Sequence, residues 1–147
     1  MQTAVFTSAT QSASRCDTRT EEAFTPVRVL LVDDSPHFLN AAIAFLSRHP
    51  QIQIVGSARS GLEAIQLVEQ TSPDLVLMDV AMPQMNGLEA TEQIKAQPAP
   101  PRVIILTLYD SPDCRESARS AGADGFVPKE EFGEDVLALI FRLFSLV

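Results

Sequence analysis

Beyond residue 25 the chain alternates between short apolar runs and longer segments in which apolar residues recur every three or four positions. The first pattern is typical of buried strands, and the second is typical of helices with one buried face. The predicted strands lie at 27–32, 51–55, 74–78, 102–106 and 125–127. The predicted helices lie at 36–49, 60–70, 86–95, 111–121 and 133–147. This alternation predicts an α/β fold, in which a parallel sheet is covered by helices on both faces.

The apolar spacing also predicts which side of each helix is buried. In the first helix the expected face is Phe38, Ala42, Phe45 and Leu46, and in the second it is Leu62, Ile65 and Val68. Asn86 and Ser111 are candidate N-caps, because their side chains can accept a hydrogen bond from the first helical turn. Pro112 suits the first helical position, where no backbone N–H is needed.

The last predicted helix is apolar on nearly all sides. Its core-facing stripe is expected to contain Val136, Leu139, Ile140, Leu143 and Val147. That leaves little for four more apolar residues to pack on, and these are Leu137, Phe141, Phe144 and Leu146. A helix of this kind is normally buried, which predicts a partner surface or a homodimer through this helix. The alternative is a broad core-facing side with a few exposed apolar residues.

Length and composition fit one globular domain, with 147 residues of which 46% are hydrophobic and 20% charged. Residues 1–25 show no periodicity and are expected to form a disordered tail, which leaves 26–147 as the folded domain. The net charge of −8 disfavours direct binding of nucleic acid by this chain. No apolar run is long enough to cross a bilayer, and the N-terminus lacks the pattern of a signal peptide, so a cytoplasmic location is expected.

Polar residues follow four of the five predicted strands directly. Asp33 and Asp34 follow the first strand, Asp79 follows the third, Thr107 follows the fourth and Lys129 comes just after the fifth. In an open parallel sheet these positions meet at one edge, where ligands commonly bind. The sequence therefore predicts a pocket that contains three carboxylates, one hydroxyl and one ammonium.

This set of residues has a chemical logic. Crowded carboxylates repel one another unless a cation joins them, and Mg²⁺ prefers carboxylate oxygen ligands. A carboxylate can also act as a nucleophile toward phosphorus, with the charge on the transferred group taken up by metal, ammonium and hydroxyl. Taken singly, each residue has a plainer interpretation: Asp33 and Asp34 as a turn or helix cap, Thr107 as a strand former and Lys129 as a surface charge.

Four segments together resemble the response regulator receiver domain: LLVDDS, LVLMDVAMPQMNGLEA, ILTLYD and GFVPKEEF. Pro83 lies four residues after Asp79 and Gly87 lies eight after it, which matches the family spacing. The resemblance runs from Val27 to the C-terminus and is nearest to receivers of the NarL/FixJ-type subgroup, although no output domain is seen in the sequence. It implies a flavodoxin-like (βα)5 fold with the strand order 2-1-3-4-5.

The resemblance also implies a role for each pocket residue. Asp79 is the expected phosphoacceptor, Lys129 contacts the phosphoryl group, and Thr107 and Phe126 are the switch residues. The Mg²⁺ ligands are expected to be Asp33, Asp34, Asp79 and the backbone carbonyl of Ala81. The positions that tune the rate of phosphoryl loss are expected to be Ala81, Leu108 and Tyr109. Leu108 is larger than the residue usual at its position, and Pro128 precedes Lys129 where the family commonly has proline after the lysine, which puts the usual cis turn in doubt.

The implied function is that of a switch in two-component signalling rather than of a turnover enzyme. A histidine kinase or histidine phosphotransfer protein would donate the phosphoryl group, and the face made by 111–121, 125–127 and 133–147 would bind a downstream protein or output domain. Three alternatives stay open: a phosphorylation-independent interaction module, the receiver part of a DNA-binding transcriptional regulator, and a phosphatase with an aspartyl nucleophile. The phosphatase would need a second acid at Ala81, two residues after Asp79, so that interpretation is weak.

Overall fold

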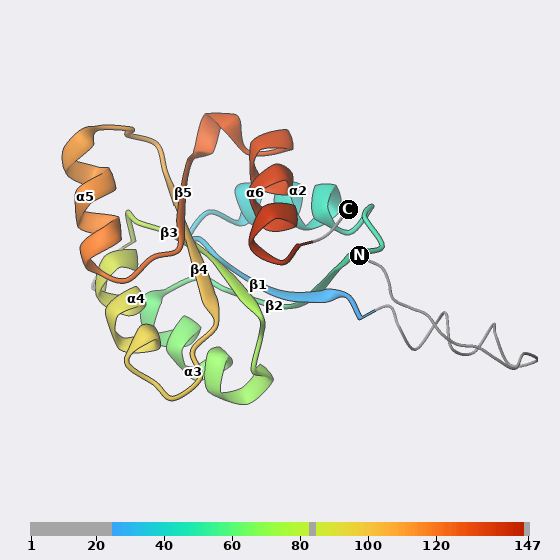
Figure 1. Ribbon diagram of the computed structural model, residues 1–147, viewed down its shortest axis with the longest axis horizontal. Helices are drawn as coiled ribbons and strands as arrows, with labels where there is room; N and C mark the ends of the chain where they lie inside the picture. The colour runs from blue at the N-terminus through green and yellow to red at the C-terminus, as the bar shows by residue number, and fades with distance from the viewer. Residues whose placement is uncertain (1–24, 83–84, 146–147) are drawn as a thin grey trace, which may run out of the picture.

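The computed structural model describes residues 25–82 and 85–145, which form the predicted α/β architecture (Figure 1). The sheet has five parallel strands. From one edge to the other they are β2 (Ile52–Ala58), β1 (Val27–Val32), β3 (Leu75–Asp79), β4 (Arg102–Thr107) and β5 (Gly125–Pro128). The order 2-1-3-4-5 confirms the expected flavodoxin-like fold. The tail predicted for residues 1–25 lies outside the described residues except for Thr25.

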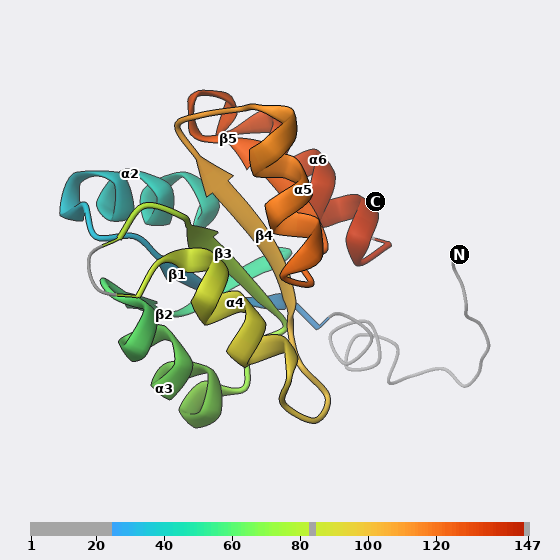
Figure 2. The ribbon, with the colours of Figure 1, turned by 90° about the vertical axis from the view of Figure 1, so that its left-hand side faces the viewer.

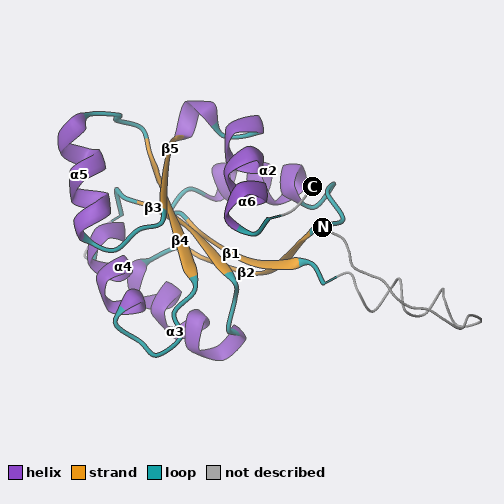
Figure 3. Cartoon of the chain, viewed as in Figure 1, coloured by secondary structure: helices purple, strands orange, loops and turns teal. Residues whose placement is uncertain are grey.

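Helices cover both faces of the sheet, as Figures 2 and 3 show. One face carries α2 (Pro36–Leu46) and α6 (Glu134–Leu143). The other carries α3 (Gly61–Thr71), α4 (Gly87–Lys95) and α5 (Pro112–Ser120). A short 3₁₀ turn, η2 (Lys129–Glu131), joins β5 to the segment before α6. In the described part of the chain, none of these helices has the length and apolar content needed to cross a membrane.

The alternation of side chains along β1 divides the core into two clusters. Val29 and Leu31 point to the face covered by α2 and α6, while Leu30 and Val32 point to the face covered by α3, α4 and α5. All four are essentially inaccessible to solvent. Because successive residues of a strand point to opposite faces, a central strand with helices on both sides must be apolar throughout.

Side-chain caps fix where four helices begin. In each case the side-chain oxygen of the cap accepts a hydrogen bond from the backbone N–H three residues later, and the caps are Ser35, Ser60, Asn86 and Ser111. At α4 the Glu89 side chain also accepts from the backbone N–H of Asn86, which completes a capping box. The predicted caps Asn86 and Ser111 are confirmed, and so is Pro112 in the first turn of α5.

Three predicted elements end at a residue more than one position from the predicted one. β2 continues to Ala58, because its last residues pair with β1 although Gly56 and Ser57 interrupt the apolar pattern. α2 ends at Leu46 instead of His49, whose backbone N–H closes a tighter turn on the Leu46 carbonyl. α6 begins only at Glu134 and ends at Leu143, while Leu146 and Val147 lie outside the described residues.

The predicted face of α2 is confirmed, and that of α3 needs one correction. In α3 the predicted Val68 is buried and Ile65 is partly buried, but Leu62 is 59% exposed and the helix instead buries Gly61 and Ala64. The reason is close packing at the start of α3, since a Cβ on Gly61 would lie only 3.0 Å from the Met85 carbonyl oxygen. In α2 the buried residues are Leu39, Ala42 and Leu46, whereas Phe38 and Phe45 are partly buried beside the same cluster.

The expected unpacked face of α6 is not found among the described residues. Val136 and Ile140 are fully buried, and Leu137, Phe141 and Phe144 are partly buried against the same cluster. In the described part of the chain the large apolar side chains left exposed are Leu62, Leu108 and Tyr109, none of which belongs to α6. The packing argument for a homodimer through this helix was therefore wrong, and the homodimer itself stays an untested prediction.

Candidate functional site

The carboxyl ends of four neighbouring strands lie together at one edge of the sheet, where the parallel arrows of Figure 2 end. Val32 pairs with Met78 and Thr107 pairs with Pro128, so the strands end at matching levels. The side chains that follow or end these strands are those predicted to gather here, namely Asp33, Asp34, Asp79, Thr107 and Lys129. These residues therefore lie at one edge because the strands are parallel and end at matching positions.

Three carboxylates form the centre of this site. Asp33, Asp34 and Asp79 each offer an oxygen, and these oxygens all lie within 4.8 Å of one another. Asp33 and Asp79 are buried, with exposed fractions of 0% and 3%, while Asp34 is exposed. The site is therefore an acidic pocket that opens to solvent on the side of Asp34.

Lys129 supplies the positive charge of the pocket. Its Nζ atom lies 2.6 Å from Oδ2 of Asp33 and 3.1 Å from Oδ1 of Asp79. Burial lowers the pKa of this ammonium, but hydrogen bonds to Asp33 and the charge of Asp79 outweigh that cost and leave the pKa above its ordinary value. Lys129 consequently stays protonated, and its ammonium bridges two of the three acids.

The Asp79 carboxyl behaves differently from an ordinary acid. Burial, together with the charge of neighbouring Asp33, raises its pKa from 3.8 to about 6, although the Lys129 ammonium acts in the opposite direction. The carboxylate form is thus only weakly favoured at neutral pH and lacks full compensation for its charge. A second cation in the pocket would supply that compensation.

The chemistry of the ligand atoms fits a magnesium ion. The cluster offers only oxygen atoms, two of the three acids are buried, and one is open to solvent. Mg²⁺ prefers such oxygen ligands and commonly keeps several waters, which the exposed side of the pocket allows. These residues therefore suit a hard divalent cation and not a soft thiophilic metal.

Gly87 fixes the loop that follows Asp79. A Cβ at this position would collide with the backbone carbonyl oxygen of Asp79, and the Gly87 N–H donates a 2.9 Å hydrogen bond to the Val80 carbonyl. This close approach explains the predicted glycine. Pro83 lies outside the described residues, and Ala81 is an exposed residue of the same loop.

Thr107 lies at the end of β4 and is buried. Its hydroxyl accepts a hydrogen bond from the Tyr109 backbone N–H at 3.1 Å and lies 3.2 Å from the Tyr109 carbonyl as a donor. The hydroxyl is therefore bound within its own loop. Leu108 and Tyr109 are exposed to solvent, with exposed fractions of 68% and 74%.

Comparison with known proteins explains this arrangement. The model of the response regulator receiver domain matches residues 29–141, which is most of the chain. The chain belongs to the response regulator receiver domain family. Receiver domains of this family act in two-component signalling, so the resemblance predicted from the four motifs is confirmed.

Relatives and solved structures agree with this assignment. The nitrate/nitrite response regulator protein NarL of Escherichia coli (strain K12) is 34% identical over 117 residues, which cover 80% of this receiver domain's chain and 54% of NarL. The transcriptional regulatory protein LiaR of Bacillus subtilis (strain 168) is 38% identical over 103 residues, which cover 70% of this chain and 49% of LiaR. The chain thus spans about half the length of these relatives.

Two solved structures share the fold of this receiver domain. A two-component response regulator of the LuxR family from Aurantimonas sp. SI85-9A1 superimposes with a TM-score of 0.78 at 30% identity, over 82% of this chain and 86% of that one. The response regulator domain of Thermotoga maritima CheB gives a TM-score of 0.75 at 29% identity, over 84% and 99% of the two chains.

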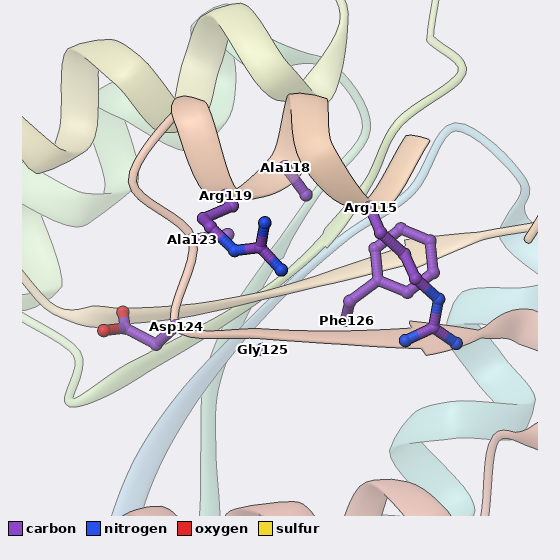
Figure 4. A pocket seen from close by; sticks show the side chains of 7 residues that line it. All are labelled: Arg115, Ala118, Arg119, Ala123, Asp124, Gly125 and Phe126. Carbon is purple, nitrogen blue, oxygen red and sulfur yellow. The ribbon is translucent and has the colours of Figure 1, made fainter. Parts of the chain in front are cut away.

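Phe126, the predicted switch aromatic, lies in β5 of the receiver domain and is partly buried. The Arg115 guanidinium lies over its ring, 4.7 Å from the centroid, and is held by two hydrogen bonds of 2.7 and 2.9 Å to Asp110. Arg115 and Phe126 line a cavity of about 200 Å³. Figure 4 shows both side chains there, between α5 and β5. Phe126 therefore packs under α5, on the face of the sheet that also carries α3 and α4 and opposite the face that carries α6.

Sequence reasoning missed one neighbour of the pocket. The ring of Phe38, in the first turn of α2, lies against the Lys129 ammonium, 4.7 Å from Nζ to the ring centroid. The apolar spacing places Phe38 only on the core face of its helix. Nothing in the local pattern distinguishes a core aromatic from one that contacts a cation 91 residues along the chain.

The doubt about a cis peptide bond next to Lys129 agrees with the structure. Among residues 25–82 and 85–145 there is no cis peptide bond, and the chain leaves β5 through the 3₁₀ turn that begins at Lys129.

Proposed function

We propose that Asp79 accepts a phosphoryl group from a histidine kinase or a histidine phosphotransfer protein, and that this modification switches the receiver domain. The observation that carries the proposal is the buried Asp79 carboxyl, paired with Lys129 and placed beside Asp33 and Asp34. The Asp79 carboxylate can act as a nucleophile toward phosphorus. The neighbouring Lys129 ammonium can pair with the anionic oxygens of the transferred group.

In the proposed reaction an Asp79 carboxylate oxygen forms a bond to phosphorus while the bond from phosphorus to the donor imidazole nitrogen breaks. The imidazole leaves with the electron pair of that bond and takes up a proton. Lys129 then pairs with an oxygen of the transferred group. Hydrolysis by water later returns the Asp79 carboxylate and releases inorganic phosphate, so the residue is a transient acceptor and the domain is a switch.

Asp33, Asp34, Asp79 and the Ala81 backbone carbonyl would hold Mg²⁺ in this proposal. Bound there, the ion would offset the charge of the acids and of the phosphoryl oxygens. Asp34 gives the pocket its exposed carboxylate, and Asp33 is shared with Lys129. In this proposal Asp33 and Asp34 bind the metal, and Asp79 alone is the nucleophile.

The Thr107 hydroxyl would connect the pocket with the rest of the molecule. To reach a phosphoryl oxygen it must give up its hydrogen bonds with the Tyr109 backbone, which reorganises the loop from Thr107 to Tyr109. Phe126 lies in β5 and its partner Arg115 lies in α5. The side of the molecule made by α5, β5 and α6 is therefore the proposed surface for a downstream protein or output domain. Ala81, Leu108 and Tyr109 are the proposed rate-tuning residues, because they follow Asp79 and Thr107 at the positions that have this role in the family.

Two further parts of the proposal concern the setting of the domain. The net charge of −8 argues against direct contact with nucleic acid by this chain, and we expect the protein to act in the cytoplasm. LiaR is named a transcriptional regulatory protein, so a role as the receiver part of a transcriptional regulator is the second candidate. Both candidates use the same acceptor chemistry.

Intact mass spectrometry after incubation with acetyl phosphate and Mg²⁺ tests the proposal. We expect the mass to rise by one phosphoryl group in the wild-type protein, with no gain in Asp79→Asn or in the presence of EDTA. Glu69→Gln is the matched control, because Glu69 is an exposed acid in the last turn of α3, which leads to the start of β3 and not to the carboxyl ends of the strands. A wild-type protein that stays unmodified, even after rapid quenching, would favour a phosphorylation-independent interaction module.

A further inference from the structure

Lys129 has an aromatic neighbour in addition to its two acids. The centroid of the Phe38 ring lies 4.7 Å from Nζ, which is within the range of about 6 Å over which an ammonium is attracted to the face of an aromatic ring. Phe38 belongs to α2 and Lys129 to the turn after β5. The contact therefore joins one of the first elements of the fold to one of the last.

Phe38 is itself held on two sides. Its backbone N–H donates to Oγ of Ser35 at 3.3 Å, and the Ser35 N–H donates to Oδ1 of Asp33 at 2.9 Å. Its ring meets the Phe132 ring edge to face, with centroids 5.2 Å apart. The position of the Phe38 ring thus depends on the same acid that pairs with Lys129.

The acids alone are poorly suited to keep Lys129 in place during the proposed reaction. In the proposed reaction Asp79 changes from a carboxylate anion to an acyl phosphate, and Asp33 would also serve the metal. Lysine has a flexible four-carbon stem, so its ammonium is free to follow whichever oxygen attracts it most. The Phe38 ring binds no metal and takes no proton, and its attraction for the ammonium is therefore the same before and after transfer.

We propose that Phe38 is a positioning residue, which holds the Lys129 ammonium beside Asp33 and Asp79 so that it can meet the incoming phosphoryl group. The consequence for the reaction rests on the proposed function, whereas the positioning of Lys129 can be tested without it. Phe38 acts only through Lys129 and contacts no reacting atom.

The contact can be measured by NMR because the sequence contains only two lysines, Lys95 and Lys129. With ¹³C-labelled lysine, the ε-CH₂ protons of Lys129 should be shifted upfield by the ring current of Phe38. Lys95 is the internal reference, since its ammonium pairs with Asp124 at 2.8 Å. We expect Phe38→Leu to abolish the upfield shift and Phe38→Trp to keep it.

The rate of Asp79 phosphorylation by acetyl phosphate and Mg²⁺ tests the role in the reaction. We expect Phe38→Leu to slow this rate about three- to tenfold, and Phe38→Trp to restore it to within about twofold, because only an aromatic ring attracts the ammonium. Phe45→Leu is the matched control. Phe45 lies on the same helix and also packs against Phe132, with centroids 6.0 Å apart, and it should keep both the wild-type rate and the Lys129 shift.

The outcomes separate the two ideas. Equal rates for Phe38→Leu and Phe45→Leu, with both proteins folded by circular dichroism, would overturn the positioning role. If Phe38→Leu does not fold, Phe38→Met takes its place in both measurements. If the wild-type protein accepts no phosphoryl group, the proposed function fails, and the NMR result then decides: a Lys129 shift lost in Phe38→Leu supports positioning, and an unchanged shift contradicts it.

Discussion

Asp79 is an ionisable residue that is almost fully buried, and its ionisation affects the stability of the fold. Its pKa is raised to about 6 by burial and by the charge of Asp33, in spite of the nearby Lys129 ammonium. The ionised form is therefore destabilising to the metal-free fold at neutral pH. A group kept in this state at some cost to stability is consistent with a role in chemistry and not in packing.

We expect Asp79→Asn to raise the free energy of unfolding at pH 7 in metal-free buffer. The folded state binds this proton more tightly than the unfolded state, whose pKa is near 3.8. The contribution of Asp79 to stability is thus fully present below about pH 4 and is lost as the pH rises through about 6. After allowance for solvent screening, the gain at pH 7 should be about 1–2 kcal/mol.

Urea titrations of both proteins in EDTA, at several values between about pH 4.5 and pH 7.5, measure this effect. The difference between variant and wild type should shrink as the pH falls. A difference that does not change with pH would show that the Asp79 pKa is not raised in the folded state.

At the scale of the elements, the loop between β3 and α4 holds the pocket together. Gly87 brings the start of α4 against the backbone carbonyl of Asp79, and the Asn86 capping box fixes the first turn of that helix. The neighbouring Met85 packs on Gly61 at the start of α3. The residues between Asp79 and Gly87 therefore position both α3 and α4. A conformational change in this loop would shift both helices.

We expect Gly87→Ala to lower the free energy of unfolding by about 2–3 kcal/mol, because the added methyl group meets backbone that cannot move aside easily. Gly56→Ala is the matched control. A Cβ there would lie 3.5 Å from Cδ1 of Leu30, which is an ordinary contact, and the change should be within about 1 kcal/mol of wild type. Chemical denaturation of both variants tests this, and equal stabilities would contradict the predicted steric conflict.

At the scale of the whole molecule, the sheet separates two apolar clusters that share every central strand. Leu31 belongs to the cluster under α2 and α6, and its neighbour Leu30 belongs to the cluster under α3, α4 and α5. Loss of packing on either face must therefore disturb the same strands. The fold should unfold as one cooperative unit and not one face at a time.

Leu30→Ala and Leu31→Ala test this cooperativity. Each should lower the free energy of unfolding by about 2–5 kcal/mol, as expected for truncation of a fully buried leucine. Each variant should also keep a single transition that is the same for the NMR methyl signals of both clusters. Separate transitions for the two sets of methyl signals would show that the faces unfold independently.

The sequence by itself determined the elements and the residues that end or follow the strands at the carboxyl edge of the sheet. Apolar runs of strand length alternate with helical spacing, and a parallel sheet must then gather the residues that follow its strands. Asp33, Asp34, Asp79, Thr107 and Lys129 could be found because they are polar residues directly after apolar runs. Cap residues such as Asn86 could also be predicted, because a cap bonds to backbone within four residues of its own position.

Only the tertiary structure decided which side chains far apart in the sequence meet. Helical spacing places Leu62 on an apolar stripe, but the approach of Met85 to Gly61 decides that Leu62 faces solvent. The extra apolar residues of α6 find partners on the α2 side of the sheet, which no local pattern predicts. The contact of Phe38 with Lys129 arises in the same way, because periodicity reports the face of an element and not what that face will touch.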